Sequence, residues 1–436
     1  MTATAKSIGI IGGGYTGLTA ALRLAQAGHN VTVWERGDFG GQAATIPLGD
    51  TRIEIFYHHL FQSDTHIQAL ATELGIGDKL MWLPSNVSYF ADGRLLPLNG
   101  ALDLLRLNII PIWDRVRVGL VTLWLQLQKD WKKYEGITAD EYLTKMLGRN
   151  AYEKTLGAQL KAKFGSYHDR VSMVWFWGKI WLRTKSRKNP LEQEKLGYFK
   201  GSFQVVANAL VQACRDAGVT MSDHTGITSL EQSGDGWVVN THSGAEHVDI
   251  VLSTTPSTIF QKLVSGLSTD YRTRLNALEY EGAIVTLLEL DHALTDTYWM
   301  NIADPEMPFT AVIEHTNFVG PENYGGRHLV YLSKYVEQNH PYFGLTDDQI
   351  MTEYLPHLQK LNPAFSSDWI KRRWIFRERA AQPITPLHYS EKIPDLKTPL
   401  DNLWLANTTQ IYPEDRGTNY AVRLGEDVAR RILAEM

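Results

Sequence analysis

A glycine-rich turn near the start of the chain carries the clearest chemical signal in the sequence. It contains the pattern Gly-x-Gly-x-x-Gly at Gly12, Gly14 and Gly17, between an apolar strand predicted over residues 7–11 and a helix predicted over residues 18–27. The backbone N–H groups and the positive end of a helix that starts at such a turn can bind a pyrophosphate. Gly12 permits the tight turn, Gly14 lets the phosphate approach the backbone, and Gly17 lets the helix pack closely on the sheet.

An acidic residue follows at the spacing that dinucleotide-binding folds use. Glu35 comes directly after a second predicted strand, residues 30–34, and its carboxylate can accept hydrogen bonds from ribose hydroxyl groups. An acid at this position disfavours the 2′-phosphate of NADP. A tight turn without a ligand would explain the glycines alone, but not the complete order of strand, turn, helix, strand and acid. The pattern therefore predicts a bound dinucleotide.

The composition excludes several other classes of protein. The chain has 436 residues, of which 44% are hydrophobic and 21% charged, so it can bury large cores and is not a disordered tail. Its net charge of −5 gives no electrostatic case for binding nucleic acid. The single cysteine, Cys214, excludes internal disulfides and dithiol chemistry. Clusters with metal-ligand spacing and a second glycine pattern for NAD(P)H are both absent from the sequence, so we expect neither ligand.

The residues after Glu35 resemble the flavin-containing amine oxidase superfamily, which includes protoporphyrinogen oxidase, phytoene desaturase and UDP-galactopyranose mutase. Members of that superfamily carry two adjacent glycines soon after the ribose-binding acid, usually followed by arginine. The two glycines are Gly40 and Gly41 here, and Gln42 takes the place of the arginine.

Three further segments extend the resemblance. Residues 49–58 are similar to a family segment that contains an acid and ends in a histidine, here Glu54 and His58. Residues 201–256 follow the order of the family's adenine-side segment, and residues 402–422 resemble its flavin-ring segment. A helix that starts in this last segment would stabilise negative charge on the reduced flavin.

The resemblance implies FAD as the cofactor. The residues that it implies as FAD-binding lie in the glycine turn, after the second strand, near the adenine side and around the start of the last helix. They are Gly12, Gly14, Tyr15, Thr16, Gly17, Glu35, Arg36, Gly41, Gln42, Ile227, Arg416, Thr418, Asn419 and Tyr420. Arg416 is a candidate ligand either for the pyrophosphate or for an anionic substrate. Its neighbours Glu414 and Asp415 are equally consistent with acidic charges at the start of a helix.

The expected fold is α/β, with a Rossmann-type FAD-binding domain and a discontinuous α+β substrate domain built from a mixed sheet plus helices. The strand and helix alternation stops near residue 80 and returns near residue 196. We assign residues 1–80, 196–260 and 396–436 to the FAD-binding domain. The substrate-binding domain then comprises residues 81–195 and 261–395, with a helical subdomain at 100–190. Within it, helices are predicted over residues 109–134, 138–147 and 172–184.

Four residues are candidates for acid–base chemistry. His58 and His59 lie in the segment that the resemblance places beside the flavin, and histidine titrates near neutral pH. Glu314 and His315 end an apolar strand whose polar end is expected to line the substrate pocket. The alternatives are that the histidines bond backbone groups at a crowded turn, and that Glu314 and His315 follow the alternation of a half-exposed strand.

The helical middle region is rich in tryptophan. Trp175, Trp177 and Trp181 precede a basic run at residues 183–188, and residues 118–128 form an apolar run too short to span a bilayer. We expect these features to form an apolar substrate entrance, or to touch a membrane surface without crossing it. A buried helical core with a solvated basic turn is the alternative. The expected location is the cytoplasm, with membrane association as a further possibility.

These features favour an FAD-dependent oxidoreductase that removes a hydride from a C–N or C–C bond of an organic, largely apolar small molecule. Oxygen or a quinone would accept the electrons. One alternative is a flavin mutase or isomerase that acts on a nucleotide sugar without net redox change. Another is a non-enzymatic escort of prenylated proteins, against which the complete glycine turn and Glu35 argue. The lysine that amine oxidases place near flavin N5 has no evident counterpart in residues 280–290.

Overall fold

Five parallel strands from separate stretches of the chain form the sheet that contains the glycine turn. The structure is a computed structural model that describes residues 4–186 and 193–436. In spatial order the strands are β19 (Leu403–Leu405), β13 (Ile250–Ser253), β1 (Ser7–Ile11), β2 (Asn30–Trp34) and β9 (Thr220–Ser222). All four pairings are parallel, as a Rossmann-type sheet requires.

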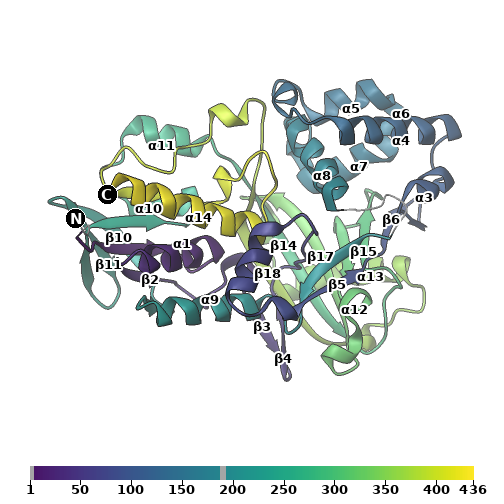
Figure 1. Ribbon diagram of the computed structural model, residues 1–436. Coiled ribbons are helices and arrows are strands. Elements are labelled where there is room, and N and C mark those ends of the chain that lie inside the picture. Colours follow the sequence, from purple (N-terminus) through teal and green to yellow (C-terminus); the bar gives the residue numbers. More distant parts are fainter. Residues whose placement is uncertain (1–3, 187–192) are drawn as a thin grey trace.

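The two faces of this sheet are covered differently. Three helices pack on one face, α1 (Tyr15–Gln26), α9 (Gln204–Asp216) and α14 (Thr418–Glu435), and share a core with Ile8, Ile10 and Val33. The other face carries a three-stranded sheet and two helices. These are β10 (Ile227–Ser233), β11 (Gly236–Thr241), β12 (Ala245–Val248), α10 (Ser257–Leu263) and α11 (Thr269–Asn276). Figure 1 shows this part on the left, with both chain ends at its outer edge.

A seven-stranded mixed sheet forms the second large element. Its spatial order is β18 (Ile370–Pro383), β14 (Tyr280–Leu290), β17 (His328–Glu337), β16 (Ala311–Glu314), β15 (Trp299–Ile302), β6 (Val87–Ala91) and β7 (Arg94–Pro97). The β15–β6 pair is parallel and the other pairs are antiparallel. One face packs on α13 (Asp347–Leu361), while Ala283, Val285 and Leu287 on the opposite face join the core of the parallel sheet.

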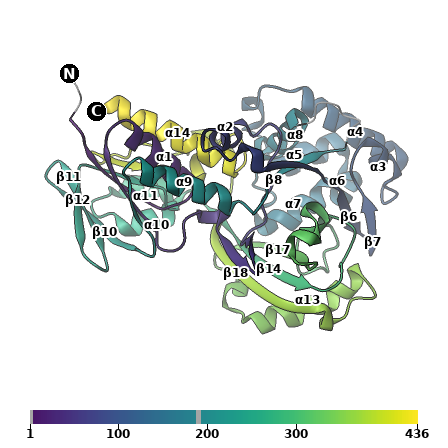
Figure 2. The same cartoon turned by 60° about the horizontal axis from the view of Figure 1, so that its bottom comes forward.

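The helical region lies over this second sheet, as Figures 1 and 2 show, and has a core of its own. Its helices are α3 (Ala101–Arg106), α4 (Ile112–Leu127), α5 (Ala139–Leu147), α6 (Arg149–Lys154), α7 (Leu156–Phe164) and α8 (Met173–Ser186). Thr138 caps α5 by accepting a bond from the Glu141 N–H at 3.1 Å, as the sequence predicts. The helix predicted over residues 109–134 is shorter, because Gln128 adopts an extended backbone and ends α4.

Short elements join these parts. They are β3 (Thr45–Leu48), β4 (Thr51–Glu54), α2 (Thr65–Glu73), β5 (Leu80–Pro84), β8 (Lys195–Phe199) and α12 (Thr316–Val319). The parallel sheet, the mixed sheet and the covering helices confirm the predicted α/β fold class. Residues 220–256 contain five short strands. Among the described residues, no helix has the length and apolar character needed to cross a bilayer.

Candidate functional site

The glycine turn has the geometry that the sequence predicts. Gly12 has a φ of 106°, which favours glycine, and a Cβ on Gly17 would lie 2.1 Å from the Gly12 carbonyl oxygen. Gly17 therefore permits the start of α1 to fold back onto the turn. A Cβ on Gly14 would meet only the Cα of Gly41, at an ordinary 3.7 Å. The space in front of Gly14 is open, as a phosphate contact requires.

Glu35 follows β2 directly and ties the glycine turn to the next loop. Its carboxylate accepts hydrogen bonds from the Gly13 N–H at 2.7 Å and from the Gly37 N–H at 3.0 Å. The Gly40 N–H in turn donates to the Gly13 carbonyl oxygen at 2.9 Å. The second glycine segment is thus held against the first. Arg36 is exposed beside the start of β10, where Ile227 lies.

Two helices point uncapped N-termini into the space near these loops. Gly14 precedes α1 and Gly417 precedes α14, and at neither position does a side chain of the described residues cap the helix. Gly417 is exposed although Thr418, directly after it, is buried. Two free helix starts suit a cofactor that brings a pyrophosphate and a flavin ring that becomes negative on reduction.

Arg416 supplies a further indication that a group belongs here. Its Nε atom is buried and has no hydrogen-bond partner among the described residues. An unpaired buried donor is costly, so such atoms normally have a ligand or water. The glycines, Glu35 and the two helix starts therefore fit FAD, and Arg416 fits either the cofactor or an anionic substrate beside it.

Several predicted FAD residues hold the surrounding elements together. The Tyr15 hydroxyl donates to the Phe203 carbonyl oxygen at 2.8 Å, and the Thr16 hydroxyl donates to the Ala421 carbonyl oxygen at 3.1 Å. The Gln42 amide donates to the carbonyl oxygens of Ala380 and Ala381 in β18. It thereby joins the second glycine segment to the mixed sheet.

The start of the last helix is positioned in the same way. The Asn419 side-chain oxygen accepts bonds from the His66 and Ile67 N–H groups and so caps α2. The Arg423 guanidinium lies 4.8 Å from the centre of the Tyr420 ring. These contacts explain the positions of Asn419 and Tyr420, and their contact with FAD stays a prediction.

Glu54 and the two predicted histidines lie between the two sheets. Glu54 is fully buried and accepts bonds from the Tyr198 hydroxyl and the Phe203 N–H, while burial raises its pKa to about 7. His58 bonds the Phe56 carbonyl oxygen through Nδ1. Burial, with a smaller effect of the Arg416 charge, lowers the pKa of His58 to about 4, so its ring is neutral at pH 7.

His59 and the pair Glu314 and His315 have different surroundings. His59 Nδ1 lies 2.9 Å from the Tyr298 hydroxyl. The Glu314 carboxylate accepts bonds from the Leu294 and Thr295 N–H groups, and burial raises its pKa to about 7. His315 Nε2 lies 2.7 Å from the Tyr324 hydroxyl, and burial lowers its pKa to about 3.

Glu314 is the last residue of β16, whereas His315 already has a helical backbone at the start of α12, so the predicted strand ends one residue earlier. The two side chains bond separate groups. Glu314 accepts bonds from backbone N–H groups of the loop at residues 294–295, and His315 bonds the buried Tyr324 hydroxyl. The acid–base role of both residues stays a prediction.

A partly buried polar cluster lies where α7 and α8 meet the mixed sheet, and of its members the sequence analysis named Trp175, Asp415 and Arg416 but missed Lys163, Lys179, Glu281 and Gln382. The Lys163 ammonium donates to the Gln382 side-chain oxygen at 2.9 Å and lies 4.1 Å from the centre of the Tyr335 ring. Lys179 of α8 pairs with Asp415, next to Arg416. Burial raises the pKa of Glu281 in β14 to about 8, against the attraction of Lys163 and Arg416. These residues come from several separate stretches of the chain, so no local pattern groups them.

Aromatic side chains line the sheet face beside this cluster. The Tyr57 hydroxyl donates to the Ser333 hydroxyl at 3.2 Å and lies 3.3 Å from the Tyr335 hydroxyl. The Tyr57 ring packs edge-on against Trp299 and Tyr331, with centroid distances of 5.2 and 5.8 Å. This face can hold an apolar organic molecule and orient it through a few hydroxyl groups.

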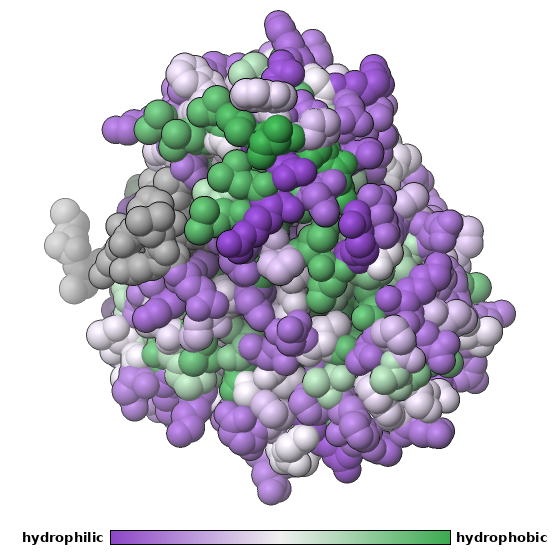
Figure 3. Space-filling model, turned by 90° about the vertical axis from the view of Figure 1, so that its right-hand side faces the viewer, coloured by the Kyte–Doolittle hydropathy of each residue, from purple (hydrophilic) through white to green (hydrophobic). Residues whose placement is uncertain are grey.

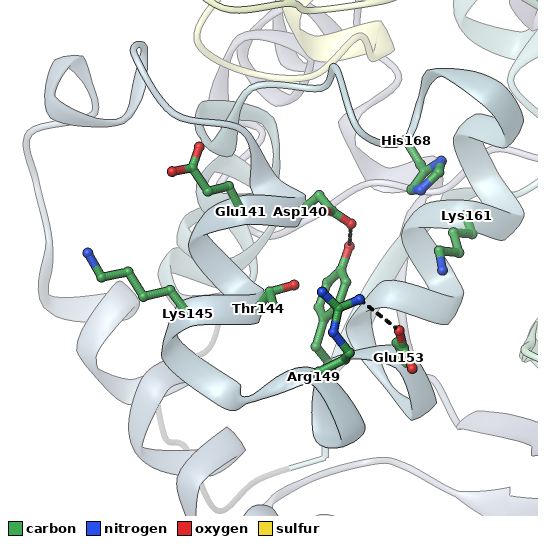
Figure 4. A pocket seen from close by; sticks show the side chains of 9 residues that line it. Asp140, Glu141, Thr144, Lys145, Arg149, Glu153, Lys161 and His168 are labelled. Carbon is green, nitrogen blue, oxygen red and sulfur yellow. Dashed lines mark hydrogen bonds and ion pairs between the residues drawn. The ribbon is translucent and has the colours of Figure 1, made fainter.

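A surface hollow of about 490 Å³ lies elsewhere, between α5, α6 and α7. Figure 4 shows its lining, in which Tyr152 bonds Asp140 and Arg149 pairs with Glu153. Its side chains carry both signs of charge, and four of the nine are joined in these two pairs. Its lining includes none of the predicted FAD-binding residues, so the hollow has no evident link to the cofactor site. Among the described residues, no group of three metal-binding side chains could hold an ion.

Comparison with known proteins finds one family that matches nearly the whole chain and relatives that match parts of it. The sequence profile of the family described as flavin containing amine oxidoreductase matches residues 15–433. The tomato (Solanum lycopersicum) 15-cis-phytoene desaturase is 31% identical over 154 residues, which are 31% of this chain and 26% of that protein. The Staphylococcus aureus coproporphyrinogen III oxidase is 25% identical over 290 residues, 58% of this chain and 61% of that protein. These matches thus span less than two thirds of either relative.

Solved structures extend the likeness to the complete fold. A protein provisionally named protoporphyrinogen oxidase, from Exiguobacterium sp. 255-15, superposes with a TM-score of 0.79 at 17% identity, and the match covers 99% of this chain and 100% of that one. At this level of identity the likeness shows the fold alone.

Proposed function

Because the chain belongs to the flavin-containing amine oxidoreductase family, we propose that it is an FAD-dependent oxidoreductase that removes a hydride from a C–N or C–C bond of an organic, largely apolar small molecule. Residues 1–80, 196–260 and 396–436 would form the FAD-binding domain in this proposal. Residues 81–195 and 261–395 would bind the substrate.

One observation carries the proposal: the second glycine segment bonds strand β18, and that strand reaches the polar cluster beside the aromatic sheet face. Gln42 bonds the carbonyl oxygens of Ala380 and Ala381, and Gln382 directly after them belongs to the polar cluster beside that face. Arg416 and Gly417 connect the same cluster to the start of α14. A flavin held by the glycines and the helix starts would therefore have the substrate face next to it.

The FAD, when bound, supplies the hydride acceptor. The protein's own residues then bind, orient and exclude water. The rings of Tyr57 and Trp299 would pack on the apolar part of a substrate, and burial of the surrounding sheet face would keep water out. His58 is neutral at pH 7 with Nδ1 engaged by the Phe56 carbonyl oxygen, which leaves Nε2 as a proton acceptor.

The alternatives receive less support. The structure of reduced UDP-galactopyranose mutase superposes with a TM-score of 0.77, so a nucleotide-sugar mutase shares the fold. The sequence identity is 14%, and at this level the shared fold does not imply a shared activity. A protein escort would not need the open approach to Gly14 or the carboxylate of Glu35. Oxygen or a quinone remains the proposed electron acceptor.

Peripheral contact with a membrane is the second part of the proposal, and the structure changes the residues involved. The predicted tryptophans are not the exposed ones: Trp177 is 4% exposed and donates to the Gln128 carbonyl oxygen, and its ring stacks on Trp181 at 5.4 Å. They pack inside the helical region because their rings and N–H groups contact other residues of that region. Part of the predicted basic run, residues 187–188, lies outside the described residues.

The exposed apolar face belongs to α3 and α4 instead. Its largest side chains are exposed by about half or more of their surface: Leu102 (69%), Ile112 (49%), Trp113 (80%), Leu120 (62%), Leu123 (52%), Trp124 (50%) and Leu127 (67%). Figure 3 shows hydrophobic atoms gathered on the side of the molecule where these helices lie. Exposed basic residues adjoin them: Arg106, Arg117, Lys129, Lys132 and Lys133. An anionic lipid surface complements both features.

Anaerobic mixing tests the redox proposal. The purified holoenzyme is mixed with amines, polyprenoids or nucleotide sugars while the flavin absorbance is followed. Bleaching by an organic substrate alone, with slow reduction by NADH or NADPH, supports oxidation of that substrate. Rapid reduction by NADPH followed by isomerisation of a sugar ring would instead identify a mutase.

A further inference from the structure

Four buried polar atoms without a hydrogen-bond partner among the described residues gather in one place. They are Glu281 Oε2, Gln382 Nε2, Trp175 Nε1 and Arg416 Nε. Folded proteins pair nearly all buried polar groups, because each unpaired one costs free energy. Four such atoms in one cluster indicate a missing polar partner rather than a defect of packing.

Contacts place Gln382, Glu281 and the Trp175 ring around Lys163, and the charge of Arg416 acts on both Lys163 and Glu281. Gln382 accepts a bond from Lys163 at 2.9 Å, and Glu281 is the direct neighbour of Gln382 across the β14–β18 pair. The Trp175 ring centre lies 5.6 Å from the Lys163 ammonium and 5.4 Å from that of Lys179. We call Lys163, Trp175, Glu281, Gln382 and Arg416 the Lys163 cluster.

The charges of this cluster and its neighbours are not balanced. Lys179 is 43% exposed and is already paired with Asp415, so this pair adds no net charge. Lys163 and Arg416 are the partly buried cations that remain, although burial lowers the pKa of Lys163. Burial keeps Glu281 largely protonated at neutral pH, since its pKa is raised to about 8. Arg416 and the charged form of Lys163 therefore leave an excess of positive charge here, which an anion would neutralise and a cationic amine would increase.

The unpaired atoms point to the same partner. Three of them, on Gln382, Trp175 and Arg416, are N–H donors, and protonated Glu281 adds an O–H donor. A carboxylate has two oxygens that accept about four hydrogen bonds, so it can satisfy donors of this number next to a cation.

We propose that the Lys163 cluster binds a carboxylate of the substrate, whose apolar body lies along the aromatic face around Tyr57. The inference rests on the proposed function and deepens it, because it names an apolar organic acid as the substrate class. Lys163 provides the charge, and Gln382 fixes the direction of its ammonium group. An amine-bearing substrate would meet an unfavourable field at this position.

Ligand binding to the flavin-loaded protein at pH 7 tests the inference. Phenylacetate, phenylacetamide and 2-phenylethylamine share an apolar ring and differ in the charge of the head group. We expect phenylacetate to bind about tenfold more tightly than phenylacetamide, and 2-phenylethylamine to bind most weakly, because charge-assisted hydrogen bonds favour the anion. Binding is followed by the perturbation of the flavin spectrum and by the shift of the melting temperature.

Two substitutions on the same helix provide the comparison. Lys163→Met is expected to weaken phenylacetate binding about tenfold or more and to leave phenylacetamide binding nearly unchanged. Lys161→Met removes an exposed lysine of α7 and should leave the affinity for both ligands unchanged. Equal affinities for the three ligands, tighter binding of the amine, or an unchanged acid preference in Lys163→Met would overturn the inference.

Further variants keep the test decisive if Lys163→Met does not fold. Lys163→Arg retains the charge and should retain the acid preference, whereas Gln382→Leu removes a neutral donor and should weaken phenylacetate binding several-fold. The ligand-induced shift of the melting temperature can be measured whether or not the protein holds flavin. A protein that binds phenylacetate but never holds flavin would contradict the proposed function alone, and a flavoprotein that prefers the amine would contradict this inference alone.

Discussion

The ammonium group of Lys163 lies 2.9 Å from the side-chain oxygen of Gln382, which joins α7 to the end of strand β18. Gln382 follows Ala380 and Ala381, whose carbonyl oxygens accept bonds from Gln42 in the second glycine segment. A short stretch of one strand thus touches both the helical region and the cofactor loops. We infer that this stretch sets the distance between a bound substrate and the flavin.

Gly14 offers the sharpest test of the FAD site. A Cβ at this position would meet only the Gly41 Cα at 3.7 Å, and its φ of −77° suits any residue, so Gly14→Val should fold. The valine side chain would fill the open space that the phosphate needs. We expect the purified variant to lose the yellow colour, measured as the ratio of absorbance at flavin and protein wavelengths.

Gly100→Val is the matched control for this substitution. Gly100 also precedes a helix, α3, and a Cβ there would meet nothing within 4 Å. This variant should hold flavin as the unchanged protein does. Full flavin occupancy in Gly14→Val would show that the phosphate is bound elsewhere.

The glycine turn could be predicted because its causes are local in sequence. Tight turning at Gly12 and close packing at Gly17 depend on residues within one strand–turn–helix unit, and the structure has both. The exposed tryptophans could not be predicted in the same way. Trp113 and Trp177 lie in similar apolar stretches, and only the packing of α4 and α8 decides that the first is exposed and the second buried.

The Lys163 cluster shows a second limit of sequence-based prediction. Its members are scattered over residues 163–416, and only Arg416 and Trp175 were candidates from the sequence, each for a separate reason. The amine-oxidase lysine has no evident counterpart in residues 280–290, which form a strand. Lys163 instead reaches the mixed sheet from helix α7. Long-range pairing creates such a site, and a single sequence carries no local signal for it.

The pH dependence of anion binding tests the state of Glu281. Burial raises its pKa to about 8, while Lys163 and Arg416 lower it and Asp415 raises it. Below pH 8 the protonated side chain can donate to a carboxylate, and above pH 8 its negative charge repels one. Phenylacetate affinity should therefore fall as the pH is raised from 7 to 9.

Glu281→Gln separates this effect from deprotonation of the lysine. Glutamine stays neutral at every pH used, so its variant should lose less affinity between pH 7 and pH 9 than the unchanged protein. Calorimetric titration with phenylacetate at several pH values measures both. An identical decline in the two proteins would assign the titration to another group, with Lys163 as the first candidate because burial lowers its pKa.

Asn419 links the last helix to α2, and its loss should affect stability. Its side-chain oxygen accepts bonds from the His66 N–H at 2.8 Å and the Ile67 N–H at 3.2 Å. Asn419→Ala leaves those groups uncapped, at a cost of about 1–2 kcal/mol, and should lower the melting temperature by about 1–2 °C. Asn419→Asp keeps the acceptor and should stay close to the unchanged protein. Asn108→Ala, at an exposed site, serves as the control.

The apolar face of α3 and α4 predicts reversible binding to anionic lipid. Trp113 and Leu120 are 80% and 62% exposed, and tryptophan suits a membrane interface because its ring is apolar while its N–H stays hydrated. Each neighbouring Lys or Arg adds about 1 kcal/mol of attraction to anionic lipid, which salt screens. Co-sedimentation with vesicles of phosphatidylcholine and phosphatidylglycerol should therefore be strong at low salt and weak at high salt.

A triple substitution locates the contact on this face. Trp113→Ser, Leu120→Ser and Trp124→Ser together remove three of its seven large exposed side chains, including both tryptophans, and should lower the bound fraction about tenfold or more. Leu95→Ser changes an exposed apolar residue of β7 outside the two helices and should bind as the unchanged protein does. Pelleting that survives the triple substitution would place the contact elsewhere. If the unchanged protein does not pellet with the vesicles at low salt, the proposed membrane contact is wrong. At low salt the electrostatic attraction of the basic residues to the lipid is at its strongest.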